Sequence, residues 1–291
     1  MQYISKIKSY FKLFRTYQWV KNIFVMAGGI FSGAIFDPSF FVLSIQATFI
    51  FCLASSSVYA LNDCIDFEQD RVHQRKKNRP IASGDISKRE GIILSLLLAI
   101  ISLSLAYLLI NYILFMIILI YLFINILYSL FLKQVILIDV FLIAFGFMLR
   151  VLAGTYALNI PPSHWIIICT MMISLFLGLS KRYAELVVDQ TESSTFKNTL
   201  YDKNFLLMLI GVSASCTIIT YGLYTIDQQT IATHGTLNLI YSLPLVIYGL
   251  FRYMFIVVLG NKGGTPSKEI FTDKHLLLSL IFYVIFIFVI I

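Results

Sequence analysis

Long apolar runs separated by short polar connections dominate this chain. A membrane helix needs about 20 largely apolar residues, and runs of roughly that length occur nine times. They cover residues 22–36, 40–61, 91–111, 112–131, 135–157, 163–180, 204–226, 236–259 and 275–291. The first run is short, and only Asn111-Tyr112 divides the third from the fourth. Because the runs are continuous rather than alternating, they disfavour a membrane barrel. The pattern predicts an all-α integral membrane protein with nine transmembrane helices.

The composition supports this prediction and the charge distribution gives an orientation. The chain is 59% hydrophobic and 13% charged, whereas soluble domains carry about 25% charged residues. If the amino terminus is cytoplasmic, the outward connections near 36–40, 111, 158–164 and 227–235 contain no Lys or Arg. The positive-inside rule then predicts a cytoplasmic amino terminus and an external carboxy terminus in a bacterial-type inner (plasma) membrane. The net charge of +7 therefore reflects the orientation of the chain in a membrane, and it is not evidence for binding to nucleic acid.

The chain is expected to form one transmembrane domain over residues 1–291, with a short amphipathic arm over about 1–18. In the arm, basic and apolar residues alternate in a way that suits a helix on an anionic leaflet. Cys52, Cys64, Cys169 and Cys216 show no paired spacing, so neither a disulfide nor a metal–thiolate site is predicted.

One polar stretch between two apolar runs points to chemistry. Asn62, Asp66 and Asp70 recur every four residues and Asp63 precedes Asp66 by three, so a helix presents them on one face. A carboxylate at the bilayer centre costs roughly 2.5–3.5 kcal/mol, so these side chains must face water, a metal or a polar ligand. Carboxylate and amide oxygens suit Mg²⁺, which often binds through carboxylates together with substrate phosphates. With the basic loop around Arg79, the stretch predicts a clamp for Mg²⁺–diphosphate. The alternative is a solvated loop that ends a helix.

These residues resemble the first Asp-rich motif of the UbiA superfamily of intramembrane prenyltransferases, which implies helices around a central cavity, here open to the cytoplasmic side. The similarity extends along nearly the whole chain and looks closest to the decaprenyl-phosphate phosphoribosyltransferase branch. The segments that carry it are Arg15-Thr16-Tyr17-Gln18-Trp19-Val20-Lys21-Asn22, Lys77-x-Arg79-Pro80-Ile81-Ala82-Ser83-Gly84, Asp139-Val140-Phe141, Lys181-Arg182-Tyr183-Ala184-Glu185-Leu186 and Phe251-Arg252-Tyr253 with Gly263-Gly264-x-Pro266. The superfamily's second Asp-rich motif is missing, since Asp189 and Glu192 are a poor substitute for it.

Basic residues at the cytoplasmic ends of the predicted spans and in the site loop are expected to bind substrate phosphate. They are Lys21, Lys77, Arg79, Lys133, Lys181 and Arg182. Arg binds phosphate through a planar fork and Lys binds it as a point charge. Ordinary flanking of spans and headgroup contact stays open as the alternative. Supporting roles are expected for Asp139, Tyr183 and Glu185, with Asp139 either positioning a basic residue or lining the acceptor pocket. The sequence gives no role to Arg150.

The resemblance implies Mg²⁺-dependent transfer of a 5-phosphoribosyl group from phosphoribosyl pyrophosphate to a polyprenyl phosphate, releasing diphosphate. Asn62, Asp66 and Asp70 are the expected catalytic residues, and with Asp63 the expected metal ligands. A single acidic motif, facing Lys and Arg side chains, suits a donor with two phosphate groups: a diphosphate that binds the metal and a separate phosphate that binds the basic residues. An aromatic prenyltransferase of the same fold is the first alternative, although it wants the missing motif. A lipid transporter is the second, although it favours polar residues in both leaflets. The expected partners are the two substrates and the membrane, and a homo-oligomer is compatible with the sequence.

Overall fold

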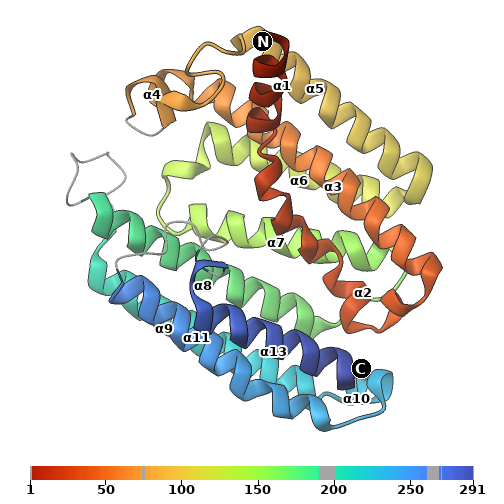
Figure 1. Cartoon of the computed structure of the whole chain (residues 1–291). Coiled ribbons are helices and arrows are strands. Elements are labelled where there is room, and N and C mark those ends of the chain that lie inside the picture. The colour runs from red at the N-terminus through yellow and green to blue at the C-terminus, as the bar shows by residue number, and fades with distance from the viewer. Residues whose placement is uncertain (1, 74–75, 190–200, 261–268, 270, 291) are drawn as a thin grey trace. The chain divides into compact units, whose positions relative to one another are not determined.

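The computed structural model describes residues 2–73, 76–189, 201–260, 269 and 271–290, and all its regular elements are helices (Figure 1). Among these residues, seven helical segments are long and apolar enough to cross a membrane. They are α3 (Pro38–Ile65), α5 (Lys88–Leu105) with the π-helical η4 (Ala106–Ile110), α6 (Tyr112–Leu130), α7 (Ile138–Ala157), α8 (His164–Asp189), α9 (Lys203–Ile226), and η7 (Asn238–Ser242) with α11 (Leu243–Val258). The all-α membrane prediction is confirmed.

The first and last predicted spans are built differently, so the count of nine is not confirmed. The run 22–36 is divided among η1 (Thr16–Val25), α2 (Ala27–Phe31) and η2 (Ala34–Phe36). Gly33, with φ of 73°, separates the last two in a left-handed conformation that glycine adopts without strain. The last run is α13 (Lys274–Ile290), which has 17 residues. At 1.5 Å per residue it is about 25 Å long, slightly shorter than a bilayer core of about 30 Å.

The described chain forms two compact units. The amino-terminal unit contains residues 1–133 and 149–161, and in it α3 packs against α5, α6 and η1 (Figure 1). Ser57 Oγ donates to the Ser95 carbonyl at 2.8 Å and Ser95 Oγ returns a bond to the Ser57 carbonyl at 2.9 Å. Small side chains that bond to the backbone in this way let α3 and α5 approach closely inside a membrane.

Helix α1 (Gln2–Leu13) docks on the polar ends of α3 and α5. Leu13 is fully buried in a cluster with Ala60, Cys64, Ile81 and Ile86. The Tyr10 hydroxyl donates to Glu90, and Lys12 Nζ donates to the carbonyl of Asn78 at 2.7 Å. Ile7 and Phe11 remain exposed. The arm predicted over about residues 1–18 thus contains a helix at Gln2–Leu13, and its amphipathic role on an anionic leaflet stays a prediction.

The carboxy-terminal unit contains residues 134–148 and 162–291. Helices α8 and α9 lie side by side, α11 packs against both, and α13 packs against α11 (Figure 1). Phe176, Leu206, Ile210 and Tyr253 are among the residues of its buried core. Glu192 and the Gly263-Gly264-x-Pro266 segment lie outside the described residues. The four cysteines are free thiols.

Candidate active site

The predicted site acids Asp63, Asp66 and Asp70 lie where α3 gives way to α4 (Phe67–Val72). The Asp66 N–H donates to the Asn62 carbonyl and the Asp70 N–H donates to the Asp66 carbonyl, both at 2.9 Å. Helix α3 nevertheless ends at Ile65 and α4 begins at Phe67, so the helix is interrupted at Asp66, and one four-residue hydrogen bond on each side of it links Asn62, Asp66 and Asp70.

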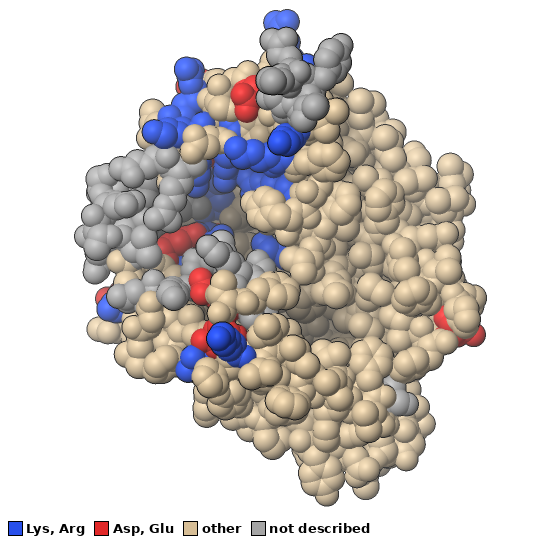
Figure 2. All heavy atoms as spheres, in the orientation of Figure 1, with Lys and Arg blue, Asp and Glu red and all other residues tan. Residues whose placement is uncertain are grey.

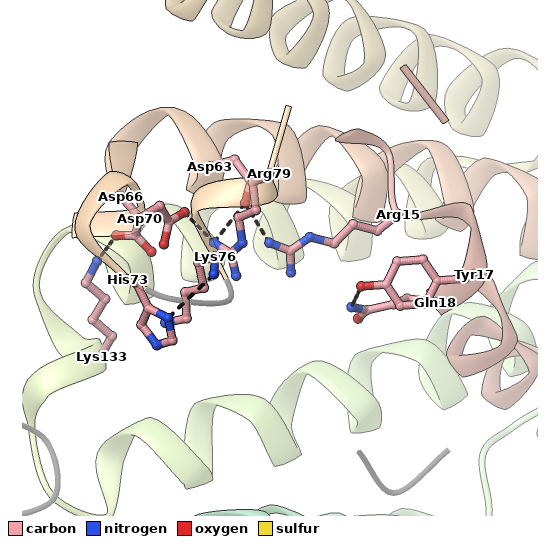
Figure 3. Close-up of polar contacts among 10 residues, drawn as sticks. All are labelled: Arg15, Tyr17, Gln18, Asp63, Asp66, Asp70, His73, Lys76, Arg79 and Lys133. Carbon is pink, nitrogen blue, oxygen red and sulfur yellow. Dashed lines mark hydrogen bonds and ion pairs between the residues drawn. The ribbon is translucent and has the colours of Figure 1, made fainter. Parts of the chain in front are cut away.

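Each of the three aspartates forms an ion pair with a basic side chain (Figure 3). Asp63 Oδ1 accepts from Arg15 Nη2 at 2.5 Å and from Arg79 Nη1 at 3.1 Å. Arg79 Nη1 also donates to Asp70 Oδ2 at 2.6 Å. The Lys133 ammonium donates to Asp66 Oδ1. We call Asp63, Asp66, Asp70, Arg15, Arg79 and Lys133 together the carboxylate cluster.

Burial makes this pairing necessary. The side chains of Asp63 and Asp70 are only 2% and 3% exposed, and that of Arg79 is 24% exposed. Removing one partner of a buried ion pair leaves an uncompensated charge and costs about 3–5 kcal/mol. The cluster balances three negative charges with three positive ones. Among the described residues, no group of three or more His, Cys, Asp or Glu side chains is arranged to hold a metal ion.

Arg15 belongs to this cluster although it was not among the predicted site residues. It lies between α1 and η1 with φ of 49°, a left-handed conformation that is uncommon outside glycine. Its guanidinium lies 5.0 Å from the centre of the Tyr59 ring. The available signal was its position at the start of the Arg15–Asn22 segment that resembles the superfamily.

Two of the predicted phosphate-binding lysines of this unit lie on 3₁₀ helices rather than on α3 or α4. Lys21 Nζ donates to Gln18 Oε1 at 3.1 Å within η1. Lys77 is exposed on η3 (Lys76–Asn78). Their assignment to phosphate stays a prediction.

A second set of charged residues lies in the carboxy-terminal unit. Arg182 Nη2 pairs with Asp139 Oδ2 and Arg182 Nη1 pairs with Glu185 Oε2, both at 2.7 Å. Lys181 Nζ lies 3.7 Å from Glu185 Oε1. The Tyr201 hydroxyl donates to Asp139 Oδ1 at 2.8 Å. The structure thus brings Asp139, Arg182 and Glu185 together, and Asp139 is in the position of a group that orients a basic side chain.

Two further residues are buried. Tyr183 is buried in the core of the carboxy-terminal unit, with the Lys203 ammonium 5.7 Å from its ring centre. Arg150, in α7, donates from Nε to Asn22 Oδ1 at 2.8 Å and from Nη2 to the Tyr121 hydroxyl at 3.1 Å. These bonds connect α7 with η1 and α6.

Charge is distributed unevenly over the amino-terminal unit. Figure 2 shows Lys and Arg side chains gathered around α1 and α4, at the end that carries the carboxylate cluster. Along α5, by contrast, Ile93, Leu96, Leu97 and Ile100 are exposed. Exposed apolar residues along a span suit contact with lipid.

Fold and site therefore define an all-helical integral membrane protein with a balanced carboxylate–guanidinium cluster at the end of a span. The sequence model of the UbiA prenyltransferase family matches residues 22–277, and the chain belongs to this family. It is a membrane-embedded transferase, as its resemblance to the superfamily implied.

Relatives along most of the chain carry the name expected from the resemblance. The chain is 30% identical over 271 residues to a decaprenyl-phosphate phosphoribosyltransferase of Corynebacterium glutamicum, covering 91% of this chain and 81% of that protein. It is 28% identical over 282 residues to the protein of that name in Mycolicibacterium smegmatis, covering 91% and 86%. Among solved structures, a UbiA homolog of Archaeoglobus fulgidus bound to GPP and Mg²⁺ has a TM-score of 0.69 with 18% identity, covering 96% of each chain. That likeness shows the shared fold.

Proposed function

We propose that this protein transfers a 5-phosphoribosyl group from phosphoribosyl pyrophosphate to a polyprenyl phosphate, releasing diphosphate in a Mg²⁺-dependent reaction. Two relatives matched along 91% of the chain are named decaprenyl-phosphate phosphoribosyltransferase. The observation that carries the proposal is the carboxylate cluster. It combines the oxygen ligands that Mg²⁺ prefers with the guanidinium and ammonium groups that bind phosphate oxygens.

The donor set fits a divalent metal by its chemistry. Asp66 and Asp70 would hold Mg²⁺, with Asn62 and Asp63 assisting. When bound, the ion supplies positive charge next to the leaving diphosphate, a kind of stabilisation that is often the largest contribution to catalysis. The A. fulgidus homolog, which is bound to GPP and Mg²⁺, supports a metal in this fold.

The ion pairs imply an exchange of partners when substrate binds. In the free protein, Arg79 neutralises Asp63 and Asp70, and Lys133 neutralises Asp66. A metal ion that binds the carboxylates would displace Arg79 and Lys133. The diphosphate oxygens would then accept hydrogen bonds from these two side chains. Neither the buried acids nor the cations would lose compensation, so the exchange avoids the cost of an unpaired buried charge.

The chemistry needs little from a general base, because the lipid phosphate is already an anionic nucleophile. Its oxygen would form a bond to the anomeric carbon of the ribose as the bond from that carbon to the diphosphate oxygen breaks. The roles of Arg15, Arg79 and Lys133 would be to bind the departing diphosphate. Arg182, oriented by Asp139, would bind a phosphate group that carries no metal.

We place the reaction at the cytoplasmic face of an inner (plasma) membrane, with the amino terminus inside and the carboxy terminus outside. The absence of Lys and Arg from the expected outward connections supports this orientation. The water-soluble donor would then enter from the cytoplasm, and the isoprenoid tail of the acceptor would lie among the apolar helices.

A single reconstituted assay tests the proposal and separates it from the aromatic prenyltransferase alternative. Purified protein is incubated with labelled phosphoribosyl pyrophosphate and polyprenyl phosphate, or with prenyl diphosphate and an aromatic acid, each with and without Mg²⁺. We expect a lipid-linked phosphoribosyl product only in the first mixture and only with Mg²⁺. A prenylated ring would refute the proposal in favour of the alternative, and no product in either mixture would favour a transporter.

Substitutions of Asp66 and Asp70 test whether this activity depends on the carboxylate cluster. Asp66→Asn and Asp70→Asn should each reduce turnover by at least 100-fold, because each removes a charged oxygen ligand whose loss costs several kcal/mol. Glu68→Gln is the matched control, since Glu68 is an exposed acid on α4. Equal activity of Asp66→Asn and Glu68→Gln would contradict the metal assignment.

A further inference from the structure

The Tyr201 hydroxyl bridges two groups at the start of α7. It accepts a hydrogen bond from the Leu137 backbone N–H at 2.6 Å and donates one to Asp139 Oδ1 at 2.8 Å. An N–H can only donate, so the single phenolic proton is committed to the carboxylate. Burial raises the pKa of Tyr201 to about 12, and the bond to Asp139 acts in the same direction. The phenol therefore keeps its proton at neutral pH.

Asp139 is almost fully buried, and both of its oxygens are used. Oδ1 accepts from Tyr201 and Oδ2 accepts from Arg182 Nη2. Hydrogen bonds to both oxygens hold the carboxylate in one orientation, and Asp139 and Glu185 together hold the guanidinium through Nη2 and Nη1. Tyr201 is thus connected to Arg182 through Asp139, which binds both side chains.

The backbone before α7 also depends on Tyr201. Leu137 has φ of 67°, a conformation that costs a branched residue of this size roughly 1–2 kcal/mol. Its N–H points to the phenol oxygen rather than continuing a helical hydrogen bond. The same hydroxyl therefore stabilises the strained residue and orients the acid two positions later.

We propose that Tyr201 is a positioning residue that sets Arg182, through Asp139, for binding a phosphate group. This inference rests on the proposed function in one respect, because it takes Arg182 as a phosphate ligand. It adds a residue that no sequence motif of this chain indicated. The ligand chemistry is a phosphate monoester dianion or inorganic phosphate, which a held guanidinium binds through its planar fork.

The test titrates inorganic phosphate into purified full-length protein without divalent metal, so that a metal-held phosphate does not contribute. Tyr201→Phe keeps the ring and removes the hydroxyl. We expect the dissociation constant for phosphate to rise roughly tenfold, the effect of one hydrogen bond to a charged group. Tyr241→Phe is the matched control, since Tyr241 is exposed on η7 and loses the same atom.

A double substitution shows whether the effect passes through Arg182. If it does, Tyr201→Phe should cause no further loss of phosphate affinity in an Arg182→Gln background. An additive loss would overturn the inference. So would a Tyr201→Phe variant with a lower melting temperature and unchanged phosphate affinity, since that result describes a purely structural residue. A wild-type protein without measurable phosphate binding would overturn it as well.

Turnover is measured separately, so that the two proposals can fail independently. Phosphate binding that depends on Tyr201, without transfer from phosphoribosyl pyrophosphate, would refute the proposed reaction and leave the positioning role in place. Transfer that is unchanged in KM by Tyr201→Phe, together with unchanged phosphate affinity, would refute the positioning role and leave the reaction in place.

Discussion

Replacing Arg79 with glutamine should have opposite effects on metal binding and on catalysis. In the free protein, one guanidinium nitrogen contacts Asp63 Oδ1 at 3.1 Å and Asp70 Oδ2 at 2.6 Å. A metal ion that binds these carboxylates must displace it. Arg79→Gln removes the competitor, so divalent metal should bind more tightly in the absence of substrate. On the proposed function, turnover should fall, because the leaving diphosphate would lose a cation that stabilises it.

The size of the effect follows from the two contacts. A hydrogen bond to a charged group contributes about 1.5–3 kcal/mol net. The Arg79 side chain is 24% exposed, and water weakens such contacts, so we take the lower end of that range for the pair together. About 1.5 kcal/mol corresponds to roughly a tenfold decrease in the dissociation constant for metal.

Mn²⁺ is a suitable probe, because the concentration of the free ion is measured directly by electron paramagnetic resonance. Arg71→Gln is the matched control: Arg71 is exposed on α4, its guanidinium lies 5.4 Å from the Phe67 ring centre, and the substitution removes the same charge. The reasoning is refuted if Arg79→Gln binds Mn²⁺ no more tightly than Arg71→Gln while both variants elute as folded protein. Tighter metal binding with undiminished turnover would refute the role of Arg79 toward diphosphate.

Two further predictions concern packing and pH. Gly154→Ala would place a Cβ against the backbone carbonyl of Val25, so we expect a loss of about 1–3 kcal/mol or more in stability; thermal unfolding should show a lower melting temperature than Gly211→Ala, where the space is open. Arg252 lowers the pKa of Asp273 from 3.8 to about 2, so their ion pair should stabilise the fold fully above about pH 4 and lose that effect as the pH falls to about 2. The difference in melting temperature between wild type and Asp273→Asn should therefore shrink across this window, and a constant difference would contradict the assignment.

The sequence was sufficient for features that depend on neighbouring residues. The four-residue spacing of Asn62, Asp66 and Asp70 predicts a shared helical face, and the structure forms the hydrogen bonds from Asp66 to Asn62 and from Asp70 to Asp66, although α3 ends at Ile65 and α4 begins at Phe67. Apolar runs likewise located the long helices. Run length alone does not report helical continuity, and for this reason the stretch 22–36 was predicted as a span although Gly33 interrupts it.

The partners of the acids could not be predicted in the same way. Arg15 lies 48 residues before Asp63, and Lys133 lies 67 residues after Asp66. Which cation meets which acid depends on the packing of α1 and η5 (Leu132–Gln134), and no local pattern encodes it. Lys133 was expected to bind phosphate, and its position on Asp66 is compatible with that role only through the exchange of partners. Tyr201 had no signal at all, because a tyrosine near the end of a polar connection is common in membrane proteins.

A balanced cluster also bears on specificity. Asp63 and Asp70 are buried at the end of a span, so the folded protein needs their cations whether or not substrate is present. A free metal ion would bind the carboxylates but leave the guanidinium groups without a negative partner. A free phosphate would bind the guanidinium groups but leave the carboxylates without a positive partner. Either alone incurs the cost of unpaired buried charge. Only a ligand that brings a cation and a polyanion together replaces both halves at once. On the proposed function, the ion pairs that stabilise the empty site would thus select metal–diphosphate over either component, and the tighter metal binding expected of Arg79→Gln would be a loss of that selectivity.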